Sequence, residues 1–368
     1  MSLDLSGVVT AGRNSWYVFA AMAIASLQLG AQERQYRIDD LGTLGAESGG
    51  YSYAYGINAS GQVTGETGTA TLHVAFLCAP GGGMSNLPTL GGVTSLGAGI
   101  ADDGDVVGYS STYNGATHAF WYRPVIGSRD LGTLGGLISY GAAINQAGEI
   151  VGSSSLSGYS PFRAFRYNAD TGLEDLGTLG GVASYAYAIN NRGDVAGCAD
   201  TSDGASHAFV LRGSRMQDLG TLGGSGSCAT GISDAGVVVG YARTPDGNQH
   251  AFRFSNGTML DLGSLNETTS SAAGVNCRGD IVGVVYTLED QERPFLYSDG
   301  SMLDLSSMID PTAGWQLRTA SGINNAGQIT GYGVHDGDFH AYVLTPATGP
   351  RPERSRSCPE PAVRESTN

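Results

Sequence analysis

The chain has 368 residues, 58 of them glycine, and a formal net charge of −15. The acidic balance excludes a surface that follows the phosphates of DNA or RNA, so we expect no nucleic-acid partner. The absence of lysine excludes Schiff-base and P-loop chemistry. The five cysteines include no CxxC pair, so we expect no zinc, no redox motif and no cofactor. The glycines follow no G-X-Y period, which is typical of many short strands joined by tight turns.

An apolar stretch near the N-terminus, WYVFAAMAIASLQLG at residues 16–30, has the length of a secretory h-region and is short for a membrane span. We therefore predict that residues 1–31 are a signal peptide or leader, and that the protein is secreted or periplasmic without an integral membrane span. Small residues at 23–25 and 29–31 offer two candidate cleavage sites. The alternative is an apolar leader with no role in export.

One motif, DLGTLGG, occurs at residues 130–136, 175–181 and 218–224, with looser copies at 40–45, 86–92, 261–265 and 304–305. A second motif, INxxGxxxG and its variants, begins at residues 57, 100, 144, 189, 232, 275 and 323. Repeats of this kind must be recognised before single residues are interpreted. A period of 43 to 48 residues fits one four-stranded blade of a β-propeller.

Each repeat contains four short segments with alternating apolar residues and glycine at the breaks, which predicts four antiparallel strands, A to D. The last repeat has no D segment, whereas YRIDDLG at residues 36–42 stands alone before the first A segment. We therefore predict a seven-bladed β-propeller over residues 36–345, in which the N-terminal strand completes the last blade. The alternative, a β-solenoid, would need capping repeats instead. Residues 346–368 are expected to form a disordered Pro/Arg/Ser tail.

Two features of strand A support this interpretation. Two positions on one face of the strand are small in every repeat, as Ala54 and Gly56 are in the first one, which predicts an innermost strand crowded by its neighbours. The asparagine that follows in five repeats, for example Asn58, is predicted to form an Asx-turn, and the glycine three residues later can adopt a positive φ.

The motifs DLGTLGG and INxxGxxxG, together with HAF at residues 118–120, 207–209 and 250–252, resemble the extracellular HAF-repeat family. The resemblance covers about residues 36–345. It implies an exported bacterial repeat protein, shaped like a propeller, and it brings no known activity or catalytic residue.

The histidine of the HAF motif recurs at one position of strand C, and arginine replaces it in two repeats (His73, His118, Arg163, His207, His250, Arg293 and His340). Equivalent positions in different blades are too far apart to share one metal ion. An Asn-Gly turn after the fifth copy would pair Phe252 with Asp261 and put His250 diagonally from that aspartate. We therefore predict structural pairs between this position and the aspartate that ends strand D (Asp130, Asp175, Asp218 and Asp261), and no metal site. The aromatic residue of each HAF copy is predicted to pack between blades.

The B–C connections (66–72, 109–117, 153–162, 198–206, 241–249, 284–292 and 332–339) differ most between repeats. Variable loops on a repeated scaffold are where binding residues are expected. We predict that a glycan or protein partner is bound on the face formed by these loops. The candidate binding residues are Tyr113, Asn114, Tyr159, Arg243, Asp246, Asp290 and Asp336, beside tyrosines 109, 241, 286 and 332. The alternative is that Asn-Gly and Asp-Gly only make hairpin turns and that the acids only solvate the rim.

The sequence therefore predicts a monomeric, non-catalytic binding module. One rival is an enzyme acting on polysaccharides through rim carboxylates such as Asp200, Asp203, Asp290, Asp336 or Asp338, and another is a purely structural repeat protein. No spacing singles out a catalytic pair. We also hypothesise a disulfide between Cys198 and Cys228, since both should lie near the same face.

Overall fold

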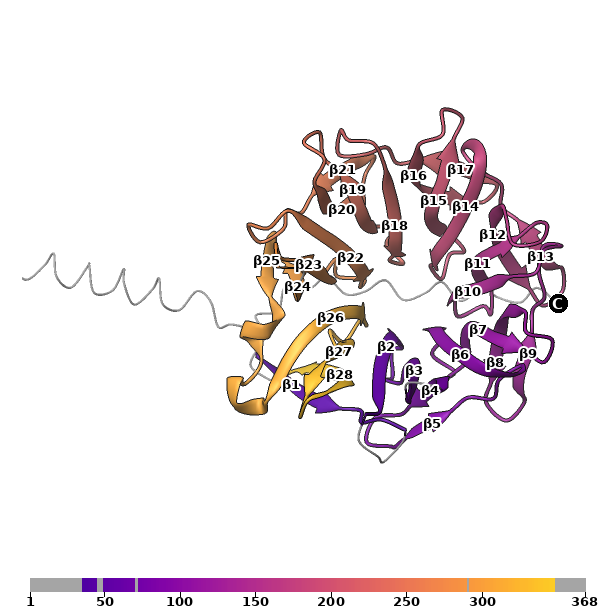
Figure 1. The fold of residues 1–368 in the computed structure, drawn as a ribbon. Helices are drawn as coiled ribbons and strands as arrows, with labels where there is room; N and C mark the ends of the chain where they lie inside the picture. Colours follow the sequence, from indigo (N-terminus) through magenta and orange to yellow (C-terminus); the bar gives the residue numbers. More distant parts are fainter. Residues whose placement is uncertain (1–34, 45–48, 70–71, 290, 348–368) are drawn as a thin grey trace, which may run out of the picture. The chain divides into compact units, whose positions relative to one another are not determined.

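The computed structural model describes residues 35–44, 49–69, 72–289 and 291–347, and the predicted leader, Asp290 and residues 348–368 lie outside this part. The described residues from Tyr36 onward form sheets of four antiparallel strands arranged around a centre (Figure 1). Single parallel pairs between strands, such as His73↔Thr94 and Gln249↔Thr269, join neighbouring sheets. The fold is therefore all-β, as the repeat pattern predicted. In the described residues no helix is long and apolar enough to cross a membrane.

The strands run in sequence order from the inside of each sheet to the outside. The first three groups are β2 (Tyr51–Ile57), β3 (Val63–Thr69), β4 (Leu72–Cys78) and β5 (Met84–Asn86); β6 (Gly91–Ile100), β7 (Val106–Thr112), β8 (Thr117–Arg123) and β9 (Gly127–Asp130); and β10 (Ser139–Ile144), β11 (Ile150–Ser155), β12 (Phe162–Asn168) and β13 (Gly172–Asp175). The next groups are β14 (Gly180–Ile189), β15 (Val195–Thr201), β16 (Ser206–Arg212) and β17 (Arg215–Asp218); β18 (Ser227–Ile232), β19 (Val238–Arg243), β20 (Gln249–Ser255) and β21 (Thr258–Asp261); and β22 (Thr269–Val275), β23 (Ile281–Tyr286), β24 (Glu292–Ser298) and β25 (Ser301–Asp304).

The remaining sheet joins the two ends of the described chain. Strands β26 (Trp315–Ile323), β27 (Ile329–His335) and β28 (Asp338–Pro346) are completed by β1 (Tyr36–Asp40), which pairs antiparallel with β28 from Tyr36↔Pro346 to Asp40↔Tyr342. The lone N-terminal D segment thus occupies the place that the repeat boundaries predicted. The strand extends one residue past the predicted end of the repeats at 345, because Pro346 still pairs with β1.

The inner strands pack against one another around the centre, and β26 contacts β2 as the others contact their successors. A Cβ added to Gly56 would lie 3.2 Å from Ala98 O of the next sheet, and one added to Gly322 would lie 3.4 Å from Tyr55 O. Both distances are at or below normal van der Waals contact. The small residues of strand A are therefore explained by the close approach of neighbouring sheets, as predicted.

Each inner strand also carries a β-bulge in this crowded region. Beside the small positions the register shifts by one residue, which leaves one residue of each inner strand unpaired in the ladder at that place: Tyr55, Ala98, Ala142, Tyr187, Thr230, Ala273 and Ser321. A bulge changes the direction of a side chain and increases local twist. Five of these seven residues are small, so the inner strands carry little bulk at their closest approach.

The aromatic residue of each HAF copy is completely buried, in agreement with its predicted packing role. Each has 0% exposure: Phe76, Phe120, Phe165, Phe209, Phe252, Phe295 and Tyr342. Each sits in an apolar cluster that draws residues from two neighbouring sheets; Phe209, for example, packs in a cluster with Val151, Ala164 and Val195.

A longer loop and a disulfide bond also connect neighbouring sheets. The longer link before β26 contains two 3-10 turns, η1 (Leu305–Met308) and η2 (Pro311–Ala313), and buries Leu305 and Met308. A disulfide joins Cys198 of β15 to Cys228 of β18, with 4.7 Å between their Cα atoms, which confirms the pairing hypothesised from the sequence. Among the described cysteines, Cys78 is a free and buried thiol.

Candidate functional site

The turns between the first and second strands of each sheet form one end of the central opening, which we call the A–B face. Asn58 accepts the N–H of Gln62 through Oδ1 at 2.8 Å and donates through Nδ2 to Ala101 O of the next sheet at 3.0 Å. Asn190 and Asn324 make the same two bonds, and Asn324 donates to Asn58 O across the junction of the last and first sheets. The predicted Asx-turn is therefore present, and its amide also links neighbouring sheets.

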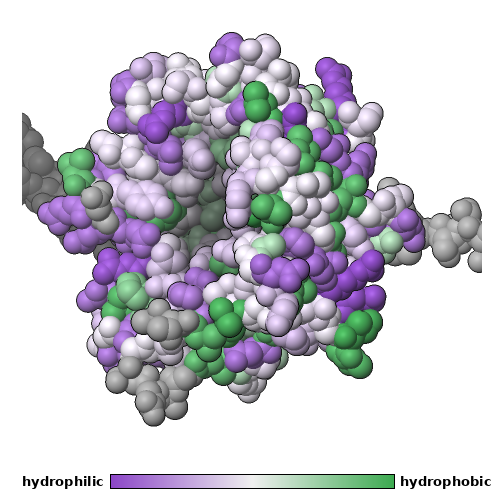
Figure 2. Space-filling model, turned by 45° about the vertical axis from the view of Figure 1, so that its right-hand side comes forward, coloured by the Kyte–Doolittle hydropathy of each residue, from purple (hydrophilic) through white to green (hydrophobic). Residues whose placement is uncertain are grey.

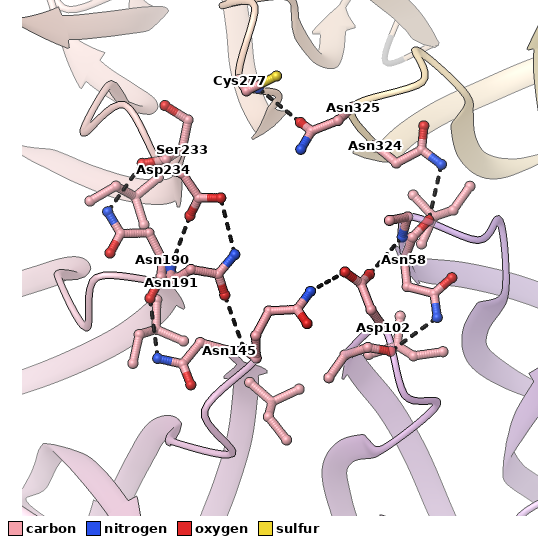
Figure 3. Close-up of a pocket in the computed structure, with 18 of the residues that line it drawn as sticks. Asn58, Asp102, Asn145, Asn190, Asn191, Ser233, Asp234, Cys277, Asn324 and Asn325 are labelled. Atoms are coloured by element: carbon pink, nitrogen blue, oxygen red, sulfur yellow. Dashed lines mark hydrogen bonds between the residues drawn. The ribbon is translucent and has the colours of Figure 1, made fainter. Parts of the chain in front are cut away.

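The residue after this asparagine adds a second set of links. Asp102 accepts the N–H of Ala59, Asn191 that of Gln146, and Asp234 that of Asn191, at 2.8 to 3.0 Å (Figure 3). These turns surround a cavity of about 200 Å³. Because its amides and carboxylates are largely bonded to one another, the A–B face offers few free polar groups to a ligand.

The opposite end, which we call the B–C face, carries the described B–C loops (113–116, 156–161, 202–205, 244–248, 287–289 and 336–337) and the D–A connections. The HAF histidines lie here against the aspartates that the sequence paired with them. His118 Nδ1 is 2.8 Å from Asp130 Oδ2, and the pairs His207–Asp218 and His250–Asp261 have the same distance. His340 contacts Asp40 of β1 at 2.9 Å. Each Asp also accepts the N–H of the glycine two residues later, at 2.7 Å for Asp130 and Gly132, so the pair holds the turn into the next sheet.

The positions that depart from HAF behave differently. Arg293 donates to Asp304 at 2.8 Å, whereas Arg163 Nε lies 3.9 Å from Asp175 and has no hydrogen-bond partner. The prediction for His73 was wrong, since its Nδ1 contacts the hydroxyl of Tyr51 instead. The register gives the reason: Phe76 pairs with Gly65 as Phe120 pairs with Gly108, so Val74 takes the place of the HAF histidine and His73 falls on the other face of the strand. Asn86, which pairs with Phe76, also stands where the other sheets have the aspartate.

A serine at the start of most inner strands completes this junction, and the sequence analysis missed it. Ser184 Oγ accepts the N–H of Ala164 in the previous sheet at 2.9 Å and donates to Gly177 O of the DLGTLGG turn at 2.6 Å. Equivalent bonds are made by Ser52, Ser139, Ser227 and Ser270. In the sequence this serine stands two residues before the first small position of strand A, and its recurrence there could have predicted the link.

A pocket of about 480 Å³ opens on the B–C face between sheet β6–β9 and sheet β10–β13. It brings together two predicted binding residues from different loops, Asn114 and Tyr159, and the pair His118 and Asp130 lies beside them. Leu137 and Ile138 form an apolar wall of the pocket. The pocket therefore combines an amide, a carboxylate, an imidazole and a phenol ring that is 69% exposed.

The other predicted binding residues lie elsewhere on the face. Tyr113 is 89% exposed and does not line this pocket. Arg243 donates to Gly247 O at 3.0 Å, and Asp246 accepts from Thr244 Oγ1 at 2.5 Å, so both stabilise their own hairpin turn. Asp336 is an exposed turn residue with φ of 51°. Asp290 lies outside the described residues. For Arg243, Asp246 and Asp336 the turn interpretation is thus the better supported one.

Aromatic side chains gather where the inner strands approach the B–C face. Tyr109 contacts Tyr140 at a ring-centroid distance of 5.0 Å, and Phe162 lies 5.9 Å from Tyr140 and 5.8 Å from Tyr185. On the other side, Tyr53 packs on Tyr332 at 4.5 Å. The space-filling view shows a hollow between the sheets, with hydrophobic and hydrophilic residues interspersed around it (Figure 2).

Glu66 of β3 lies within this aromatic region and accepts a hydrogen bond from the Tyr55 hydroxyl at 3.3 Å. Burial raises the pKa of its carboxyl group above the usual value, although nearby His73 and the Tyr55 bond act in the opposite direction. Burial and the charge of Glu66 also raise the pKa of Tyr51 to about 12. In the described part of the chain, no group of three or more His, Cys, Asp or Glu side chains is placed to hold a metal ion.

No protein-family model matches the chain, and no curated protein matches it. The resemblance to the HAF-repeat family therefore rests on the motifs alone. Among solved structures the chain is similar to TolB from Acinetobacter baumannii, with 14% identity and a TM-score of 0.44, over 82% of this chain and 65% of that one. It thus spans about two thirds of the length of that protein. A putative gluconolactonase has 13% identity and a TM-score of 0.42, with 84% and 92% of the chains covered. An Aleuria aurantia lectin described as a six-bladed β-propeller has 11% identity and a TM-score of 0.38, with 86% and 98% covered.

Proposed function

We propose that the protein is an exported, monomeric, seven-bladed β-propeller that binds a glycan on its B–C face without catalysing a reaction. The observation that carries this proposal is the pocket between sheets β6–β9 and β10–β13, where Asn114 and Tyr159 meet from two loops. Both residues stand in B–C loops, which differ most between repeats, and such loops are where binding side chains are expected. Asn114 also holds the turn position that Asp203 and Asp246 hold in their own loops.

The chemistry of the pocket suits a polyhydroxylated ligand. The ring of Tyr159 offers a flat amphipathic surface for the C–H face of a sugar. The amide of Asn114 can both donate and accept, and the carboxylate of Asp130 accepts, so adjacent sugar hydroxyls would find complementary partners. A mostly apolar pocket with a few convergent polar groups is the usual form of a small-ligand site.

A screen of the protein against immobilised bacterial, plant and fungal glycans, followed by calorimetry on the glycans that bind, tests the proposal. Tyr159→Ala and Asn114→Ala should each weaken binding about 10-fold or more, which corresponds to about 1.4 kcal/mol. The matched controls are Tyr113→Ala, which changes an exposed tyrosine beside Asn114 that does not line the pocket, and Asn248→Ala, which changes an asparagine in another B–C loop. Binding that is unchanged in Tyr159→Ala, or the absence of any bound glycan, would overturn the proposal.

The second candidate is an enzyme acting on polysaccharides, and the observation that favours it is the half-buried Glu66 beside the Tyr55 hydroxyl, whose carboxyl group has a pKa raised by burial, as the general acid of such an enzyme would. The same glycans would then be cleaved by the wild-type protein and left intact by Glu66→Gln. Reducing-end release measured over hours decides between the two functions.

A further inference from the structure

A second group of side chains on the B–C face lies where the first and last sheets meet, away from the pocket of Asn114 and Tyr159. Tyr53 of β2 contacts Tyr332 of β27 with ring centroids 4.5 Å apart and planes at 66°. Phe339 of β28 lies 5.8 Å from Tyr53 and 6.2 Å from Tyr332, and 40% of its surface is exposed. The three rings thus form a compact, partly exposed aromatic surface.

Two carboxylates accompany these rings, and we call the five residues together the tyrosine–carboxylate patch (Tyr53, Tyr332, Phe339, Glu66 and Glu292). Glu292 of β24 accepts a hydrogen bond from the Tyr332 hydroxyl, at 3.4 Å through Oε2. Glu66 pairs in register with Tyr53. After burial, the charges of Glu66 and Glu292 are the next causes that raise the pKa of Tyr53, so both carboxylates act on the same ring.

Neither carboxylate forms a salt bridge in the described part of the chain. The arginine salt bridges found there involve other acids, and His73, whose charge acts on Glu66, has the Tyr51 hydroxyl as its contact. Removing a carboxylate from water without a counter-charge costs free energy. A bound cation would offset that cost.

The repeat itself does not require these acids. The position of Glu66 is occupied in the other repeats by Tyr109, Ser153, Cys198, Tyr241, Val284 and Tyr332. The position of Glu292, three residues before the buried aromatic of its strand, is occupied by His73, Thr117, Phe162, Ser206, Gln249 and Phe339. Each acid is the single carboxylate among the seven residues of its position, so the scaffold does not explain it.

We propose that the tyrosine–carboxylate patch binds an alkylammonium cation. The faces of Tyr53, Tyr332 and Phe339 attract the cation through their quadrupoles. Glu66 and Glu292 neutralise its charge, and the net charge of −15 steers cations toward the protein. The cation can come from a free quaternary ammonium compound or from a methylated lysine side chain of a peptide, since both carry the same group.

Titration calorimetry with tetramethylammonium chloride at constant ionic strength tests this proposal, with tert-butanol as the neutral analogue of similar shape. We expect saturable binding of tetramethylammonium and none of tert-butanol. The variant Glu66→Gln/Glu292→Gln should bind at least about 10-fold more weakly, whereas Glu174→Gln, which removes an exposed carboxylate from the outer strand β13, should bind as the wild type does.

Tyr332→Phe keeps the ring and should retain binding within about 3-fold, whereas Tyr332→Leu should lose it. Choline and a trimethyl-lysine peptide, titrated separately, distinguish the two sources of the cation. Equal binding of tert-butanol, or unchanged affinity in the double variant while its thermal unfolding stays cooperative, would overturn the proposal. Glycan binding through Asn114 and Tyr159 should be unaffected by these variants, so the two proposals fail independently.

Discussion

The two ends of the central opening are built from the same repeats but use their polar groups in opposite ways. On the A–B face, the side-chain amides of Asn58, Asn190 and Asn324 form hydrogen bonds within their own turn and to the next sheet. On the B–C face, Tyr113 and Tyr159 are 89% and 69% exposed, and Glu66 has one tyrosine hydroxyl as its hydrogen-bond partner. Residues that recur in every repeat therefore have structural roles in this protein. Side chains that remain able to bond to a ligand are found at positions where the repeats differ.

The aromatic residue that every repeat shares should contribute more to stability than any residue on the exposed B–C face. Phe209→Ala should lower the free energy of unfolding by about 3–5 kcal/mol, because the side chain has 0% exposure and its removal leaves a cavity. Urea unfolding followed by tyrosine and tryptophan fluorescence measures this. Tyr113→Ala, on the exposed B–C face, is the control and should change stability by less than about 0.5 kcal/mol. A small loss in Phe209→Ala would show that the motif does not hold the sheets together.

Removal of a linking asparagine on the A–B face should cause an intermediate loss of stability. Asn190→Ala removes the bonds from Asp194 N and to Ser233 O and leaves buried groups without partners, at a cost of about 1–3 kcal/mol. Glycan and cation binding should be unchanged at temperatures where the variant is folded. Loss of ligand binding in this variant, with normal unfolding, would instead place a site on the A–B face.

The smallest expected change in stability is the pH-dependent contribution of the Glu66 carboxyl group. Its folded pKa is raised, chiefly by burial, so the folded state binds the proton more readily than the unfolded state does. The ionised carboxyl therefore lowers stability above the folded pKa, and this penalty disappears below the unfolded pKa. Glu66→Gln should be more stable than the wild type at pH 7.5 and equal to it at pH 4, in paired thermal unfolding experiments. Equal stability at both pH values would mean that burial does not disfavour the charge.

Much of the fold was predictable from the sequence because the repeats carry their own boundaries. The period predicted four-stranded units, and the unmatched segment at residues 36–42 predicted the pairing of β1 with β28. The turn Asn256–Gly257 predicted the register Phe252↔Asp261, which the structure has. Small residues beside the bulges predicted crowding at the centre, and the buried HAF aromatics followed from their recurrence.

The candidate sites were less predictable because they depend on residues from different repeats. The sequence named Asn114 and Tyr159, but only packing of neighbouring sheets puts them in one pocket. Glu66 and Glu292 were not named, since an acid in a B–C segment looks the same whether it is solvated or surrounded by tyrosines. His73 was misassigned because the first copy has two residues between its histidine and its phenylalanine instead of one, which puts Val74 at the place of the HAF histidine.

The pairing of β1 with β28 has a consequence for the way this chain can be cut. Tyr36 and Pro346 are opposite one another on neighbouring strands, so a short linker can join these two positions. New ends opened in any D–A connection would then give a circular permutant with the same strand pairs. In such a permutant the covalent break moves from the His340–Asp40 pair to another sheet, while the order of sheets around the centre stays as it is.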